Sequence, residues 1–124
     1  MSDIDFDQLV DRYIAVWNES DTARRADAVA AVFAEDGTFT DPLSDVRGHE
    51  GLEAVIAGVQ KQFPGFVLRR GGPVDGHHGI ARFTWELAPE AGGEALVVGF
   101  DTVVVGEDGR IATVLGFFDK VPAA

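Results

Sequence analysis

The sequence contains no cysteine, few basic residues and no long apolar run. The absence of cysteine excludes disulfide bonds and thiolate metal sites, which fits a reducing compartment. Ten lysines and arginines stand against 21 aspartates and glutamates, so the formal net charge is −11. Nucleic acids and anionic membranes bind basic surfaces, and neither is therefore expected as a partner.

No segment approaches the roughly 18 consecutive apolar residues that a membrane-spanning helix needs. The first residues, MSDIDFDQLVDRY, are acidic and lack the uninterrupted apolar stretch of a signal peptide. We therefore expect a cytoplasmic protein. The length of 124 residues suits one domain, spanning residues 1–124, that can bury a core without covalent cross-links.

The first half of the chain carries three helical patterns. Apolar residues at three- and four-residue steps predict helices over residues 6–17, 22–34 and 49–63. Asp5 with Gln8 resembles a capping box, and Ser20 or Asp21 is expected to cap the second helix. Gly37 is expected to end that helix in the left-handed conformation. A short strand follows over residues 38–41, and residues 43–47 are expected to form a loop.

The second half of the chain has the alternating pattern of β-strands. Strands are predicted over residues 66–74, 80–87, 95–105 and 110–119, with residues 75–79 forming a turn. The order of elements is then α-α-β-α-β-β-β-β. This order predicts an α+β domain in which helices cover one face of a curved sheet.

Several motifs resemble ketosteroid isomerases, which belong to the NTF2-like superfamily, and the chain is also similar to the broad SnoaL-like group. The matching segments are RYIA at 12–15, WN at 17–18, VFAEDGTFTDP at 32–42, RG at 47–48, GPV at 72–74, FD at 100–101 and GRI at 109–111. The resemblance implies an NTF2-like cone, a curved mixed or antiparallel sheet covered on one face by three helices. It also implies a homodimer.

The resemblance implies catalytic roles for Tyr13, Asp41 and Asp101. Asp41 would move a proton, while Tyr13 and a protonated Asp101 would donate hydrogen bonds to an enolate oxygen. The residues themselves support this, since Tyr13 lies on an apolar helix face and Asp101 interrupts an apolar strand, where a carboxylate is costly. Alternatives stay open: Asp101 could face outward at an interface, and Asp41 could serve only as a turn residue that accepts backbone N–H groups.

Strand alternation predicts an apolar pocket beside these acids. If Asp101 faces the pocket, Val97 and Gly99 do so as well, and the alternative is that such residues are simply core. The resemblance implies that Phe83, Trp85 and Leu87, and Val114, Gly116 and Phe118 on the last strand, belong to the apolar lining. The residues expected to bind a substrate are Trp17, Val55, Val59, Phe83, Trp85, Leu87, Val103, Val114, Gly116 and Phe118.

Two departures from the isomerase pattern concern the helices. The link over residues 19–25 is longer and carries Arg24 and Arg25, and Ile56 occupies the position of a second aromatic hydroxyl that supports the tyrosine. His77 and His78 are interpreted as a turn rather than a metal site, and His49 as a helix cap.

The sequence is compatible with two functions. The first is an isomerase, cyclase or lyase that needs no cofactor or metal and removes a proton alpha to the carbonyl of a small hydrophobic molecule. The alternative is a non-catalytic ligand-binding or dimeric interaction domain. Homodimerisation is expected through the outer face of the long strand, formed by Leu96, Val98, Phe100 and Val104.

Overall fold

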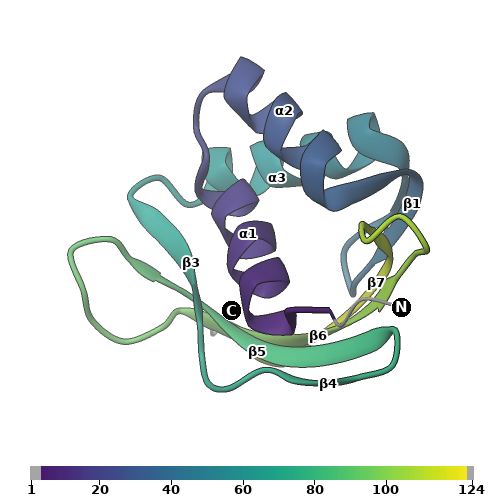
Figure 1. Ribbon diagram of the computed structural model, residues 1–124. Coiled ribbons are helices and arrows are strands. Elements are labelled where there is room, and N and C mark those ends of the chain that lie inside the picture. Colours follow the sequence, from purple (N-terminus) through teal and green to yellow (C-terminus); the bar gives the residue numbers. More distant parts are fainter. Residues whose placement is uncertain (1–3, 123–124) are drawn as a thin grey trace.

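The computed structural model describes residues 4–122, which form an α+β domain of three helices and a seven-stranded sheet. Its elements are α1 (Phe6–Asn18), α2 (Thr22–Val32), β1 (Phe33–Thr40), β2 (Asp45–Arg47), α3 (Gly48–Gln62), β3 (Phe66–Arg70), β4 (Asp75–His77), β5 (Ile80–Pro89), β6 (Val97–Val105) and β7 (Ile111–Lys120). The helices lie together on one side of the curved sheet (Figure 1). The expected α+β arrangement, with helices on one face, is confirmed.

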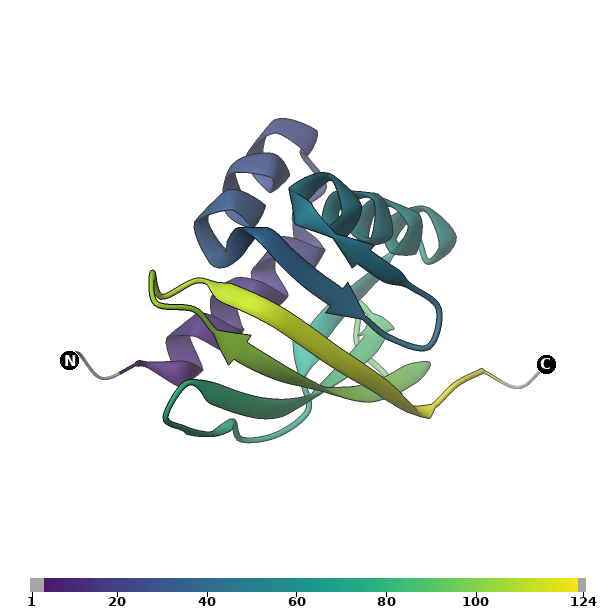
Figure 2. The same cartoon turned by 90° about the vertical axis from the view of Figure 1, so that its right-hand side faces the viewer.

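The sheet has the strand order β2-β1-β7-β6-β5-β3, and β4 pairs with β5 outside this path. Neighbouring strands are antiparallel except for β1 and β7, which run parallel. Figure 2 shows β7 between β1 and β6, crossing in front of α1. The pairing of β1 with β7 brings residues 33–40 beside residues 111–120.

Aspartate side chains cap the first two helices. Asp5 accepts a 3.0 Å hydrogen bond from the backbone N–H of Gln8, and Asp21 accepts one of 2.9 Å from that of Arg24. These bonds satisfy N–H groups that have no partner inside a helix. The predicted caps of α1 and α2 are confirmed, with Asp21 rather than Ser20 in the second case.

The predicted end of α2 is wrong. The helix ends at Val32, and Phe33 already pairs with Ile111 of β7, so β1 begins five residues before the predicted strand. Gly37 belongs to β1 and is not among the residues with positive φ. A Cβ at Gly37 would lie 2.8 Å from the Phe33 ring, so the glycine makes room for that ring where the register shifts.

Three shorter segments also differ from expectation. Residues 45–47, predicted as a loop, form β2 against Thr38–Thr40, and part of the predicted turn 75–79 forms β4. His49 does not cap α3, because its Nε2 lies 2.7 Å from the carbonyl oxygen of Phe33 and ties the helix to β1. Strand pairing overrides local turn propensity at β2 and β4.

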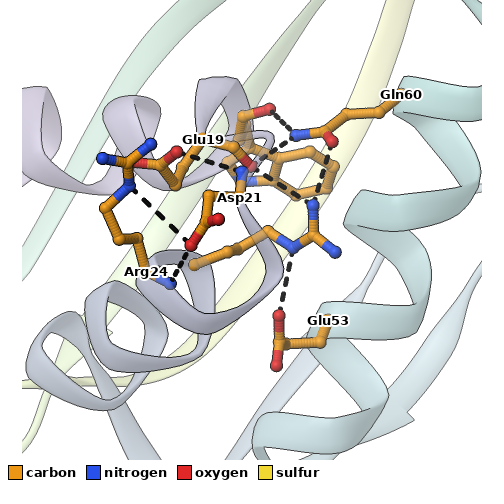
Figure 3. A network of polar contacts seen from close by, with 7 residues as sticks. Glu19, Asp21, Arg24, Glu53 and Gln60 are labelled. Atoms are coloured by element: carbon orange, nitrogen blue, oxygen red, sulfur yellow. Dashed lines mark hydrogen bonds and ion pairs between the residues drawn. The ribbon is translucent and has the colours of Figure 1, made fainter.

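A polar network around Arg25 joins the three helices. The Arg25 guanidinium is buried and bonds Glu53 Oε1 at 3.0 Å, Gln60 Oε1 at 2.9 Å and the carbonyl oxygen of Glu19 at 3.2 Å. Gln60 donates to the carbonyl oxygens of Trp17 and Glu19, each at 2.9 Å. Figure 3 shows Glu53 and Gln60 reaching from α3 toward the junction of α1 and α2. The link 19–25 is therefore held in place by partly buried polar contacts.

Candidate active site

A cavity of about 410 Å³ lies between the helices and the sheet. This volume falls within the range of ligand pockets. Most of its wall is apolar, and its carboxylates belong to Asp41 and Asp101. The lining residues are Trp17, Phe39, Asp41, Leu43, Ser44, Val55, Val59, Gln62, Phe63, Leu68, Trp85, Leu87, Val97, Asp101, Phe118, Val121 and Pro122.

Asp101 is the buried acid of this cavity. It lies in the middle of β6 with 6% of its surface exposed, and its Oδ1 accepts a 3.0 Å hydrogen bond from Trp85 Nε1. Burial raises the pKa of Asp101 to about 7; the Trp85 hydrogen bond opposes this rise, and the negative charge of Asp41 adds to it. A carboxyl group with this pKa is present in both its neutral and its ionised form near neutral pH.

Two glycines make room for the Asp101 and Trp85 side chains. A Cβ at Gly99 would collide with the Trp85 indole and the carbonyl oxygen of Phe117. A Cβ at Gly116 would lie 2.6 Å from Asp101 Oδ1 and 3.4 Å from Asp41 Cβ. Gly99 pairs with Trp85 and Gly116 with Asp101 across neighbouring strands. Because Gly99 has no side chain, the Trp85 indole can pack on β6. Because Gly116 has none, Asp101 of β6 and Asp41 after β1 can both approach the β7 strand that lies between them.

Asp41 directly follows β1, which the parallel pairing with β7 brings beside Gly116. Its Oδ1 accepts hydrogen bonds from the backbone N–H groups of Leu43 at 2.9 Å and Ser44 at 2.8 Å. Oδ2 has no hydrogen bond to residues 4–122, so one carboxylate oxygen holds the loop and the other is free for a ligand. The loop-fastening role considered from the sequence is therefore present.

Tyr13 does not line the cavity. It is 1% exposed on α1 and lies against Trp17 and Phe83, with ring centroids 6.3 and 6.2 Å away. Burial raises the pKa of the Tyr13 phenol well above its usual value; the charges of Asp101 and Asp41 add to this, and the Trp17 indole opposes it. The phenol therefore stays protonated and lies behind the cavity wall.

The predicted wall residues divide into two groups. Trp17, Val55, Val59, Trp85, Leu87 and Phe118 line the cavity together with Asp41 and Asp101. Val103 and Val114 are fully buried in the core, Gly116 lies beneath Asp101, and Phe83 contributes to a second hollow of about 420 Å³ near β4. Strand alternation indicates which side chains lie on the inner face of the sheet. It does not indicate which of them are covered by helices and which line the cavity.

Several lining residues were missed from the sequence. Gln62 and Phe63 follow Val59 by three and four positions, so helical spacing could have identified them. Leu68 is paired with Leu87 in the structure, which the sequence does not specify. Nothing in the sequence indicates that Leu43, Ser44, Val121 and Pro122 reach the cavity rim.

The cavity wall combines apolar side chains with acidic ones. Among residues 4–122, no lysine, arginine or histidine lines it, and no group of three potential metal-ligating side chains occurs. The arrangement can therefore accept an apolar ligand and exchange protons with it through two carboxyl groups. Within the same residues, no helix has both the length and the apolar character required to cross a membrane.

The SnoaL-like domain family matches this chain over residues 10–114. A structure from Agrobacterium tumefaciens strain C58, provisionally assigned as an isomerase of the SnoaL-like family, is 36% identical with a TM-score of 0.85, covering 90% of this chain and 95% of that one. Among curated proteins, none matches the sequence.

More distant structures share the fold. A provisionally assigned SnoaL-like polyketide cyclase from Jannaschia sp. CCS1 is 16% identical with a TM-score of 0.70, covering 96% of this chain and 90% of that one. A provisionally assigned polyketide cyclase from Sinorhizobium meliloti is also 16% identical, with a TM-score of 0.68 and coverage of 88% and 93%. At such identities the likeness concerns the fold alone.

Proposed function

The chain belongs to the SnoaL-like domain family, and we propose that it is an acid–base enzyme of the isomerase or cyclase type. Its substrate would be a small hydrophobic molecule with a carbonyl group. The observation that carries this proposal is the buried Asp101 carboxyl, with a pKa of about 7, which shares one apolar cavity with a second carboxylate across Gly116. Pairs of acids with different environments are typical of proton-transfer sites.

In the proposed reaction, Asp41 Oδ2 takes a proton from the carbon next to the carbonyl group. The electrons of the broken C–H bond move to the carbonyl oxygen, giving an enolate. Neutral Asp101 donates a hydrogen bond that stabilises this oxygen, while Tyr13, to which the resemblance gives the same role, lies outside the cavity. Asp41 then returns its proton to a carbon of the enolate, so no proton or electron is lost and no cofactor is required.

The charge of the cavity narrows the substrate class. Asp41 and Asp101 are acidic, and no basic side chain of residues 4–122 lines the wall to offset them. An anionic ligand would lose its hydration without gaining a positively charged partner. We therefore expect uncharged ketones, esters or lactones rather than carboxylates or phosphorylated compounds.

Deuterium exchange tests the proposed reaction. In D₂O, 2-tetralone exchanges its alpha protons, and NMR follows the rate with wild type, Asp41→Asn and Asp101→Asn. The wild type should accelerate exchange, and Asp41→Asn should lose that acceleration while 2-tetralone still binds. If Asp41→Asn exchanges the protons as fast as wild type, Asp41 is not the base.

A non-catalytic ligand-binding domain is the second candidate. The hydrogen bonds from Leu43 and Ser44 to Asp41 Oδ1 favour it, because they give the carboxylate a structural role. Binding of uncharged ketones without acceleration of exchange, over a panel of ring sizes, would support this candidate.

We also propose a homodimer formed through the outer face of the sheet. On this face, Val104, Leu115 and Phe117 are 36%, 42% and 54% exposed, and Phe117 stacks on Phe100 with ring centroids 5.2 Å apart. Exposed apolar patches of this kind often mark interfaces. Sedimentation at micromolar concentration should give a dimer for wild type and a monomer for Phe117→Glu; a wild-type monomer would contradict the proposal.

A further inference from the structure

The exposed large apolar side chains of residues 4–122 gather in two places. Two of them, Leu43 and Val121, lie outside the strands and line the cavity. Their exposed fractions of 81% and 57% place both side chains at the cavity opening. The others lie on the outer face of the sheet, where the homodimer is proposed: Ile80, Val104, Leu115 and Phe117.

A hydrogen-bonded turn holds Leu43 at the opening. Asp41 Oδ1 accepts the backbone N–H groups of Leu43 and Ser44, and the N–H of Asp41 donates to the carbonyl oxygen of Ser44 at 2.9 Å. The turn joins β1 to β2, which pair with each other on either side of it. The backbone of Leu43 is therefore fixed, and its side chain is exposed because of this fold rather than because the loop is loose.

Val121 reaches the same opening from the other end of the sheet path. It directly follows Lys120, whose Nζ bonds Glu94 Oε1 at 2.9 Å and the carbonyl oxygen of Ala95 at 2.8 Å, so the end of β7 is fastened to the segment before β6. Because β1 and β7 run parallel, their carboxyl ends lie at the same end of the sheet (Figure 2). Leu43 and Val121 both follow these strand ends.

The two side chains extend the apolar wall of the cavity outward. A single exposed leucine is ordinary on a protein surface. Here two exposed apolar side chains from different segments border one apolar cavity, and apolar surface that continues into a pocket is typical of a ligand site. A ligand that ended inside the cavity would leave Leu43 and Val121 in water, whereas a ligand that continued through the opening would cover them.

We infer that Leu43 and Val121 form a binding subsite outside the cavity, the apolar rim, for a hydrophobic tail of the ligand. This inference deepens the proposed function, on which it rests, by naming the substrate class. The carbonyl group lies beside Asp41 and Asp101, and the rest of the molecule is an elongated, uncharged chain or ring system that leaves through the opening. The rim selects long ketones or esters over compact ones that the cavity encloses.

A series of methyl ketones of increasing length, from 2-pentanone to 2-undecanone, tests the apolar rim. Trp17 and Trp85 are the two tryptophans of the chain and line the cavity, so NMR titration of their indole N–H signals gives each dissociation constant. In wild type the affinity should rise along the series by up to about fourfold for each added methylene group, the effect of burying it.

Leu43→Ser should bind 2-pentanone as wild type does and 2-undecanone about fivefold more weakly, because only the long ketone reaches the rim. The substitution keeps the backbone N–H that Asp41 accepts, and the exposed side chain contributes little to folding. Leu43→Met keeps an apolar side chain and should keep the affinity. Ile80→Ser removes an exposed apolar side chain away from the cavity and should bind both ketones as wild type does. Equal affinities of wild type and Leu43→Ser for 2-undecanone would overturn the inference.

NMR of the unmutated protein provides a measurement that does not depend on the variants. With 2-undecanone bound, the terminal methyl group of the ketone should give nuclear Overhauser contacts to the methyl groups of Leu43 and Val121. Contacts only to inner wall residues such as Val55 and Leu87 would show that the tail folds inside the cavity, and the inference would be wrong.

A second copy of the chain is the other occupant that these experiments can reveal. If Leu43→Ser dissociates a dimer in sedimentation and leaves the affinity for 2-undecanone unchanged, the rim binds a partner subunit and the inference is overturned. If the rim binds the tail but 2-tetralone exchange is not accelerated, the apolar rim stands and the catalytic proposal falls. If exchange is accelerated while Leu43→Ser has no effect on 2-undecanone, the catalytic proposal stands and the rim is refuted.

Discussion

Replacing Asp101 by asparagine should make the protein more stable at alkaline pH than wild type. The folded protein holds the Asp101 proton up to a pKa of about 7, whereas the unfolded chain releases it near the ordinary value of 3.8. Between these values the folded state binds more protons than the unfolded state, so the free energy of unfolding falls as pH rises. The side-chain amide of Asp101→Asn releases no proton between these pH values. The free energy of unfolding of the variant therefore does not fall for this reason as pH rises.

The size of the effect follows from the difference between the two pKa values. A difference of about 3 units corresponds to about 4 kcal/mol at high pH, since one unit equals about 1.36 kcal/mol. Roughly 2–3 kcal/mol of this appears between about pH 5 and about pH 8. The asparagine Oδ1 can still accept the Trp85 hydrogen bond, so the substitution removes the ionisable group and keeps the contact.

Urea denaturation near pH 5 and near pH 8 measures the effect. The free energy of unfolding of wild type should fall between these conditions by roughly 2–3 kcal/mol more than that of Asp101→Asn. Asp119→Asn is the control, because it removes one negative charge at an exposed position. Its free energy of unfolding should depend on pH as that of wild type does, which would show that the loss of one charge is not the cause of the Asp101→Asn effect. If Asp101→Asn and wild type lose stability equally, the fold does not keep Asp101 neutral, and Asp101 cannot be the neutral hydrogen-bond donor of the site.

Substitutions at three further places, the Asp41 loop, Gly99 and the Arg25–Glu53 pair between the helices, test the packing of the domain. Asp41→Ala should lower the free energy of unfolding by about 1–3 kcal/mol, because the backbone N–H groups of Leu43 and Ser44 lose their acceptor. Asp41→Asn keeps an accepting oxygen and should nearly match wild type. Equal stability of Asp41→Ala and wild type in urea would contradict the loop-fastening role. Gly99→Ala should cost about 1–3 kcal/mol by pushing the Trp85 indole off β6, and an unchanged near-ultraviolet spectrum and stability would exclude that contact. Arg25→Met should lower the free energy of unfolding by about 3 kcal/mol, because it leaves Glu53 unpaired. The double variant Arg25→Met/Glu53→Leu should recover part of this loss in thermal denaturation. If the losses of the two single variants simply add in the double variant, the two side chains are not coupled.

The Asp101 environment is the part of the site that the sequence indicates best. Its position among valines on a long apolar strand predicts burial, and the alternation of the neighbouring strand predicts that Trp85 shares an apolar face with Phe83 and Leu87. Both are correct in the structure, as are the caps at Asp5 and Asp21. Each of these depends on a local period or a local hydrogen bond, which a few adjacent residues determine.

Tertiary structure alone decides which distant residues meet. The parallel pairing of β1 with β7 brings Asp41 to Gly116 and hence near Asp101, and a one-residue change in register would remove this contact. The depth of Tyr13 behind Trp17 depends on how α1 settles against the sheet, and the rim at Val121 depends on where the last strand ends. Sequence periodicity determines the face on which a side chain lies. Its neighbours on that face, and its access to the cavity, depend on long-range packing that no local pattern encodes.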